Sequence, residues 1–191
     1  MRRILRLDNI MIQLKDILNE ISKDESLRLI DKIKNKDFTF FARGDNGKVY
    51  ELNGEDLLFK ITSEPDETAV ADVIVGRYGE FNAFIPVHYS DSERKMYIMN
   101  KASKLDSNSR IEIEKFYTGF KEFARQQGGE TSIFDYLNAD GARNIDPKFI
   151  SFLRALEQQV KKTGIGDLDL SLDFKPDNIM LWNGNYVMID W

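Results

Sequence analysis

Two Asn-Gly dipeptides, each between short runs of β-forming residues, constrain the fold of this chain most tightly. Asn53-Gly54 separates Lys48–Leu52 from Leu57–Thr62, and Asn183-Gly184 separates Ile179–Trp182 from Asn185–Ile189. Asn and Gly accept the positive φ angles that a two-residue turn needs, so the pattern predicts a β-hairpin at each place. Any fold for this chain must therefore contain at least two antiparallel strand pairs.

The remaining segments predict helices and further strands around these hairpins. Apolar residues recur at helical spacing from Ile10 to Ile21 after the N-cap candidate Asp8, and a shorter helix follows through Leu27 and Ile33. Further helices are expected at Pro65–Tyr78, which Gly79 ends, and at Ile111–Arg125, Ile133–Leu137 and Pro147–Lys162, and further strands at Phe38–Ala42, Phe84–Tyr89 and Lys95–Met99. Five strands with one helix after the third, followed by a helical half, predict an α+β fold in two lobes.

Composition narrows the chemistry that this chain can perform. The 191 residues include 32 acidic and 27 basic side chains, a net charge of −5, with one histidine, His88, and no cysteine. Disulfides and a cysteine nucleophile are excluded, a histidine-based zinc site is not expected, and the acidic balance argues against nonspecific nucleic-acid binding. We find no export signal and no apolar run of about 20 residues, so we expect no membrane span and a cytoplasmic location.

The first candidate site lies between the first two expected strands. Gly44-Asp45-Asn46-Gly47 would let the backbone approach a polyphosphate, and Val49 could cover a purine. Lys60, on the next strand, shares a face with Leu58 and could neutralise phosphate charge. Taken alone, the pattern favours an ordinary glycine-bearing β-turn, and it favours an edge lysine that faces water at Lys60.

The second candidate site is the segment Asp173-Phe174-Lys175-Pro176-Asp177-Asn178. It combines a proton acceptor in Asp173, a cation in Lys175 and an oxygen ligand for Mg²⁺ in Asn178. Asp190 follows the second hairpin, whose strands bring their ends together, so Asn178 and Asp190 can share a metal.

In this order, the motifs resemble the eukaryotic-like protein kinase fold over roughly residues 38–191. The resemblance implies a helical extension at residues 1–37, an N-lobe with a five-stranded antiparallel sheet and one helix at residues 38–102, and a reduced helical C-lobe at residues 103–191. It also implies ATP and Mg²⁺ as cofactors and serine or threonine of protein substrates as acceptors.

The resemblance gives each motif a role. Gly44 and Gly47 would lie over the phosphates, with Ala42 in place of the family's usual first glycine. Lys60 would hold the α- and β-phosphates, Asp173 would orient or deprotonate the acceptor hydroxyl, and Lys175 would contact the γ-phosphate. Asn178 and Asp190 would bind Mg²⁺. The segment after Met99, from Asn100 to Ala102, would offer backbone groups to adenine.

An acid on the helix after Lys60 completes the family's nucleotide site. Glu67 is the first choice because it shares a helix face with Ala71, Ile74 and Tyr78. It is closer in sequence to Lys60 than is usual in the family, so Asp72 is an alternative, and either acid could simply be solvated.

The chain also departs from the family pattern. Ser171 and Leu172 replace the usual His-Arg, so activation by phosphorylation of a loop is not expected. Only Trp191 follows Asp190, where a long activation segment would stand. The chain thus resembles minimal kinases such as RIO-type kinases and small bacteriophage serine/threonine kinases. If it is encoded by a phage, the expected location is the host-cell cytoplasm.

Several alternatives remain open at this level. The chain could be part of a longer enzyme, a nucleotide-binding pseudokinase, or a small-molecule kinase of the aminoglycoside phosphotransferase type. Those enzymes usually lack a lysine at the position of Lys175, which favours protein substrates. A non-enzymatic alternative is an interaction module that docks a partner through the N-terminal helices, especially residues 8–21.

Overall fold

The structure is a computed structural model that describes residues 24–77, 79–129, 131–141, 145–163 and 174–191. The expected helix at residues 8–21 and the candidate residues Ser171, Leu172 and Asp173 lie outside these ranges.

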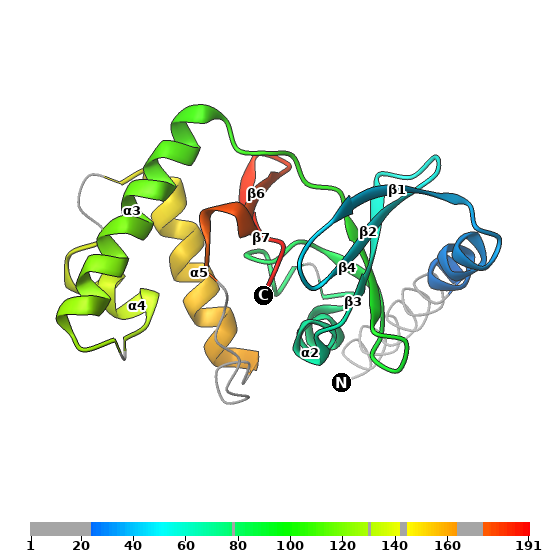
Figure 1. The fold of residues 1–191 in the computed structure, drawn as a ribbon, viewed down its shortest axis with the longest axis horizontal. Helices are drawn as coiled ribbons and strands as arrows, with labels where there is room; N and C mark the ends of the chain where they lie inside the picture. The colour runs from blue at the N-terminus through cyan, green and yellow to red at the C-terminus, as the bar shows by residue number, and fades with distance from the viewer. Residues whose placement is uncertain (1–23, 78, 130, 142–144, 164–173) are drawn as a thin grey trace, which may run out of the picture.

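A five-stranded antiparallel sheet forms one half of the molecule (Figure 1). Its strands are β1 (Phe38–Arg43), β2 (Gly47–Leu52), β3 (Leu57–Thr62), β4 (Val87–Asp91) and β5 (Met96–Asn100). They are ordered β1-β2-β3-β5-β4, so β3 is the central strand. Gly54 has a φ of 75° in the turn between β2 and β3, as the Asn-Gly signal predicts. The expected α+β class and the five-stranded sheet are confirmed.

Helices form the other half, while α2 (Pro65–Ile74) and the helix at residues 24–34 lie against the sheet. The helical half contains α3 (Ser107–Gln126), α4 (Ile133–Tyr136) with a π-helical turn at Leu137–Gly141, and α5 (Pro147–Thr163). A 3₁₀ turn at Pro176–Asn178 leads into the second hairpin, β6 (Ile179–Trp182) and β7 (Asn185–Met188). Residues 24–34 form one further helix.

The helix expected from Ile111 begins earlier, at Ser107, because the Asp106 side chain caps it by accepting from the N–H groups of Asn108 and Ser109. Two other boundaries differ because of long-range backbone pairing. The helix expected to run to Tyr78 ends at Ile74, because Gly76 has a φ of 69° and its N–H donates to the Val87 carbonyl at 3.0 Å. The strand expected from Phe84 begins at Val87, because the backbone at 84 and 85 pairs with Met188 of β7 instead.

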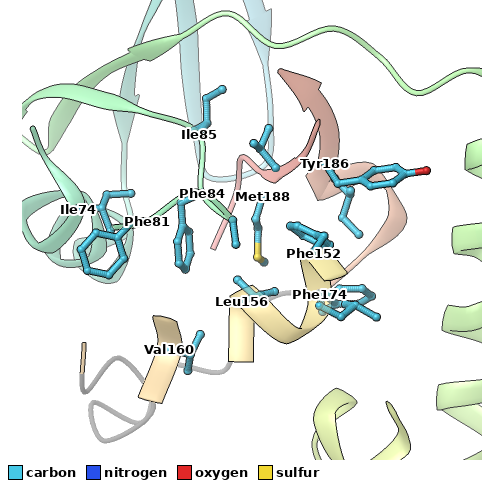
Figure 2. Close-up of a cluster of buried hydrophobic side chains, with 14 of the residues drawn as sticks. Ile74, Phe81, Phe84, Ile85, Phe152, Leu156, Val160, Phe174, Tyr186 and Met188 are labelled. Carbon is cyan, nitrogen blue, oxygen red and sulfur yellow. The ribbon is translucent and has the colours of Figure 1, made fainter. Parts of the chain in front are cut away.

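The sheet has two covered faces with separate clusters of buried side chains. On the face that we call outer, Leu29 of helix 24–34 packs with residues that include Leu52 and Phe59. On the inner face, α2 and the helical half share one larger core. Figure 2 shows the middle of that core, where Met188 of β7 lies between Phe84 and Leu156 of α5.

The β6–β7 hairpin joins the two halves. The Met188 N–H donates to the Ala83 carbonyl at 2.8 Å, and the Ile85 N–H donates to the Met188 carbonyl at 3.0 Å. On the other strand, Ser103 and Leu181 exchange backbone hydrogen bonds of 2.8 and 2.9 Å. These bonds carry the residues after β7 to the inner face of the sheet. None of the helices in the described ranges combines the length and apolar character that crossing a lipid bilayer requires.

Candidate functional site

Lys60 is the centre of the candidate site. It lies on the central strand with its side chain on the inner face, the face of Leu58, as strand alternation predicts. The residue is only 7% exposed, and its ammonium contacts Glu67 Oε1 at 3.0 Å and Asp190 Oδ1 at 2.7 Å. The alternative that Lys60 is an edge lysine facing water is wrong.

Glu67, and not Asp72, is the helix acid that contacts Lys60. Pro65 begins α2, so Glu67 lies in the first turn and points back toward β3, where it is 3% exposed. Asp72 is exposed and accepts a hydrogen bond from the Ser92 hydroxyl. The alternative that Glu67 is a solvated acid is therefore also wrong.

Burial dominates the electrostatics of this group. The pKa of Glu67 is raised from 4.5 to about 7, mainly by burial against the attraction of Lys60, with the nearby Asp190 carboxylate contributing to the rise. Burial, together with the charges of Glu67 and Asp190, also raises the pKa of Tyr97 well above 10. Glu67 Oε2 and the Tyr97 hydroxyl are both buried, with no hydrogen-bond partner within the described part of the chain. The site therefore holds an excess of buried oxygen atoms.

The two expected metal ligands lie on adjacent chain segments. Asn178 is buried at the end of the 3₁₀ turn, and its carbonyl accepts from the N–H of Ile189, the residue before Asp190, at 2.9 Å. The Asp190 side chain is 41% exposed although it contacts Lys60. A carboxylate, a carboxamide and the buried Glu67 Oε2 are hard oxygen donors, which fit Mg²⁺. The described residues contain no cluster of three or more His, Cys, Asp or Glu side chains arranged to hold a metal.

The segment before Asn178 is held from outside the hairpin. Arg110 of α3 donates to Asp177 Oδ1 at 2.7 Å, a pair that is largely exposed. Lys175 is exposed one residue before the 3₁₀ turn. Asp173 lies outside the described residues, so its position relative to Lys175 and Asn178 stays a prediction.

The glycine turn has a local structure of its own. The Gly44 N–H donates to the Gly47 carbonyl at 3.0 Å, and the Asn46 carbonyl accepts from the Ser63 N–H at 2.7 Å, which fastens the turn to the end of β3. A Cβ atom at Gly47 would overlap the carbonyl oxygen of Ile61, whereas one at Gly44 would meet nothing. Backbone packing thus accounts for Gly47 without any ligand, and nothing in the structure requires glycine at position 44.

The other expected nucleotide contacts lie on the same face of the sheet as Lys60 or just beyond it. Val49 is directly opposite Lys60 on β2, and buried Met99 of β5 is opposite Leu58. The Asn100 side chain contacts His88 Nε2 at 3.0 Å. The backbone N–H of Asn100 donates to the Pro86 carbonyl at 3.0 Å, and that of Lys101 donates to the Asp56 carbonyl at 3.1 Å. Ala102 follows, half-buried against the inner core.

Sequence reasoning missed two residues of the site. Tyr97 is paired with Lys60 on β5, and Trp191 donates its indole N–H to the Glu67 carbonyl at 3.0 Å. Alternation puts Tyr97 on the face of Met99, but only the strand order β3-β5 brings it beside Lys60. The sequence position next to Asp190 was the one signal for Trp191, which sequence analysis would class as a packing residue.

Comparisons with protein-family models, with curated proteins and with solved structures found no match to this chain.

Proposed function

We propose that this protein is an ATP- and Mg²⁺-dependent kinase that transfers the γ-phosphate to serine or threonine hydroxyls of protein substrates. A kinase-like two-lobed fold, with its division near residues 102 and 103, is part of the proposal. The observation that carries it is the buried Lys60 ammonium, held between Glu67 and Asp190 from positions far apart in the sequence. A buried lysine fixed by a carboxylate is suited to holding phosphate oxygens in a set position.

The described residues divide the work of phosphoryl transfer among them. Lys60 would bind the α- and β-phosphates while Glu67 fixes the direction of its ammonium, and Val49 and Met99 would contact the adenine ring. Asp190 and Asn178 would hold Mg²⁺, which when bound neutralises charge on the phosphates. Most of the rate would come from positioning and electrostatic stabilisation.

The acceptor side of the reaction falls to Asp173 and Lys175. The acceptor hydroxyl would form a new bond to the γ-phosphorus as the bond to the β-phosphate oxygen breaks, and the hydroxyl proton would pass to Asp173. Lys175 is exposed, which suits a cation that meets the γ-phosphoryl group at the mouth of the site. Its presence also favours protein substrates over aminoglycoside-like small molecules.

The test is transfer of labelled γ-phosphate from ATP to the protein itself and to a protein extract. Wild type should label acceptors, while Asp173→Asn and Lys60→Ala should lose at least about 100-fold of the rate, because each removes a charge that the transition state needs. The matched control is Lys95→Ala, which removes a lysine that contacts the Ser63 carbonyl instead. Equal labelling by wild type and Asp173→Asn would rule out the enzyme, and nucleotide binding without transfer would indicate a pseudokinase. Labelling of a small hydroxylated amine but of no protein would show that the acceptor is a small molecule and not a protein.

A further inference from the structure

Trp191 makes three directed contacts in the candidate site. Its ring stacks on Tyr97 with centroids 5.8 Å apart and meets the edge of Phe84 at 5.7 Å. Its indole N–H donates to the backbone carbonyl of Glu67 at 3.0 Å. The residue therefore joins β5, the loop before β4 and the first turn of α2.

Besides the Trp191 bond, the first turn of α2 is held by the Thr68 hydroxyl, which donates to the Pro65 carbonyl at 2.8 Å, and by the Lys60–Glu67 pair. The N-cap residue of this turn, Glu64, makes no side-chain cap hydrogen bond. Helix first turns fray when their N–H groups are uncapped, because those groups have no partner within the helix. Glu67 lies in this turn, so the direction of its carboxylate toward Lys60 depends on how firmly the turn is held.

Trp191 also follows Asp190, the second carboxylate on Lys60. In this dipeptide, Asp190 forms an ion pair with Lys60, and Trp191 forms a hydrogen bond to the backbone of Glu67, the other carboxylate on Lys60. Movement of this dipeptide would shift both carboxylates at once.

We infer that Trp191 is a positioning residue that holds α2 so that Glu67 stays on Lys60. The inference rests on the proposed function for its effect on catalysis, but not for its effect on α2. Its mechanism is local: the indole N–H fixes the Glu67 carbonyl, the stacked rings fix the indole, and the Lys60–Glu67 contact follows.

Hydrogen exchange of the α2 amides at residues 69–74 tests the inference without any reference to activity. Trp191→Phe keeps a ring on Tyr97 and removes the donor, so these amides should exchange about 3- to 10-fold faster, the range that one neutral hydrogen bond gives. The matched control is Trp182→Phe, because Trp182 packs against the same core from β6, an element separate in the chain from α2. Unchanged α2 exchange in Trp191→Phe would overturn the inference, as would an equal increase in Trp182→Phe.

A second variant isolates the N–H group from the ring. In the Trp182→Phe background, Trp191 is the only tryptophan, and it can be replaced by a benzothienyl analogue in which sulfur takes the place of N–H. We expect the analogue to match Trp191→Phe in α2 exchange although it keeps the ring area. If α2 exchange with the analogue equals that with tryptophan, the indole hydrogen bond does not stabilise α2.

Transfer kinetics then separate this inference from the proposed function. If wild type transfers phosphate, Trp191→Phe should lower kcat about 3- to 10-fold, as one lost hydrogen bond predicts, with Trp182→Phe unchanged. Faster α2 exchange with no transfer by wild type would support the positioning role and overturn the kinase. If wild type transfers phosphate and Trp191→Phe changes neither α2 exchange nor kcat, the kinase is supported and the positioning role is overturned.

Discussion

Lys60 is a buried cation with a carboxylate on each side, so the three side chains together carry more negative than positive charge. With Lys60, Glu67 and Asp190 all ionised, the cluster carries one negative charge more than positive. Burial makes that excess unfavourable, which is the reason that the pKa of Glu67 is raised to about 7. A proton on Glu67 or a divalent cation on Asp190 would each offset this excess negative charge. Protonation of Glu67 and metal binding at Asp190 should therefore oppose one another.

The raised pKa of Glu67 predicts a pH-dependent stability in the absence of nucleotide and metal. The folded state holds the proton more tightly than the unfolded state, whose pKa is 4.5. The contribution of Glu67 is therefore fully present below pH 4.5 and is lost as the pH rises toward 7, with a slope of at most about 1.4 kcal/mol per pH unit. Glu67→Gln should remove this slope, as denaturant titrations at pH 4.5, 6 and 7.5 would measure. A stability difference between wild type and Glu67→Gln that stays constant over this range would contradict the assignment.

The two acids of α2 predict opposite outcomes in the transfer assay. Glu67→Gln should lower phosphoryl transfer about 10- to 1,000-fold, because Lys60 loses the charged partner that directs its ammonium. Asp72→Asn should change transfer less than about 2-fold, since Asp72 is exposed and its carboxylate accepts a hydrogen bond from Ser92. Steady-state rates at saturating ATP measure both. A larger loss of transfer in Asp72→Asn than in Glu67→Gln would contradict the assignment of Glu67 and favour Asp72, the alternative that the sequence left open.

At the scale of residues, the sequence predicts the side chains that use local spacing and misses those that depend on strand order. Lys60 follows from the alternation in β3, and Glu67 from its helix face. Tyr97 and Trp191 join them only because β5 pairs with β3 and the hairpin returns to the sheet. Neither fact is written in spacing along the chain.

At the scale of elements, the glycine turn separates two residues that look alike in the sequence. Gly47 has no room for a Cβ because the Ile61 carbonyl lies against it, whereas Gly44 faces open space. Gly47→Ala should therefore destabilise the protein by about 1–3 kcal/mol, and Gly44→Ala by less than about 0.5 kcal/mol. Thermal or denaturant unfolding of the two variants side by side measures this.

The same pair of variants also bears on ligand binding. If the turn covers the phosphates, Gly44→Ala should weaken ATP binding while leaving stability unchanged, because a methyl group would then meet the nucleotide and nothing else. Isothermal titration of ATP measures the effect. Unchanged affinity would mean that Gly44 lies away from the bound nucleotide.

Element boundaries show where local signals end. Gly79 is as good a helix-ending signal as Gly76, and the choice between them falls to the hydrogen bond from Gly76 to Val87 on β4. Likewise the β-forming residues Phe84 and Ile85 pair with β7 and not within the sheet. Strand and helix types are thus predictable here from periodicity, while their ends depend on distant partners.

At the scale of the whole molecule, one core runs through the inner face of the sheet, α2, α3, α5 and the second hairpin. Such a shared core favours cooperative unfolding, because neither half can expose its side of the core without cost to the other. Met188 is fully buried in the middle of this core and also makes the backbone bonds that join the halves (Figure 2).

Met188→Ala should therefore weaken both halves together. We expect a loss of about 2–5 kcal/mol in the free energy of unfolding, the range for removing a fully buried methionine side chain. Far-UV circular dichroism, which reports mainly the helices, and fluorescence of Trp191 in a Trp182→Phe background should still give coincident transitions. Met96→Ala is the matched control, because Met96 is half-buried at the edge of the outer cluster and should cost less than about 1.5 kcal/mol. Separate transitions for the two probes, with the Trp191 signal unaffected by Met188→Ala, would show that the sheet and the helical half are independent folding units.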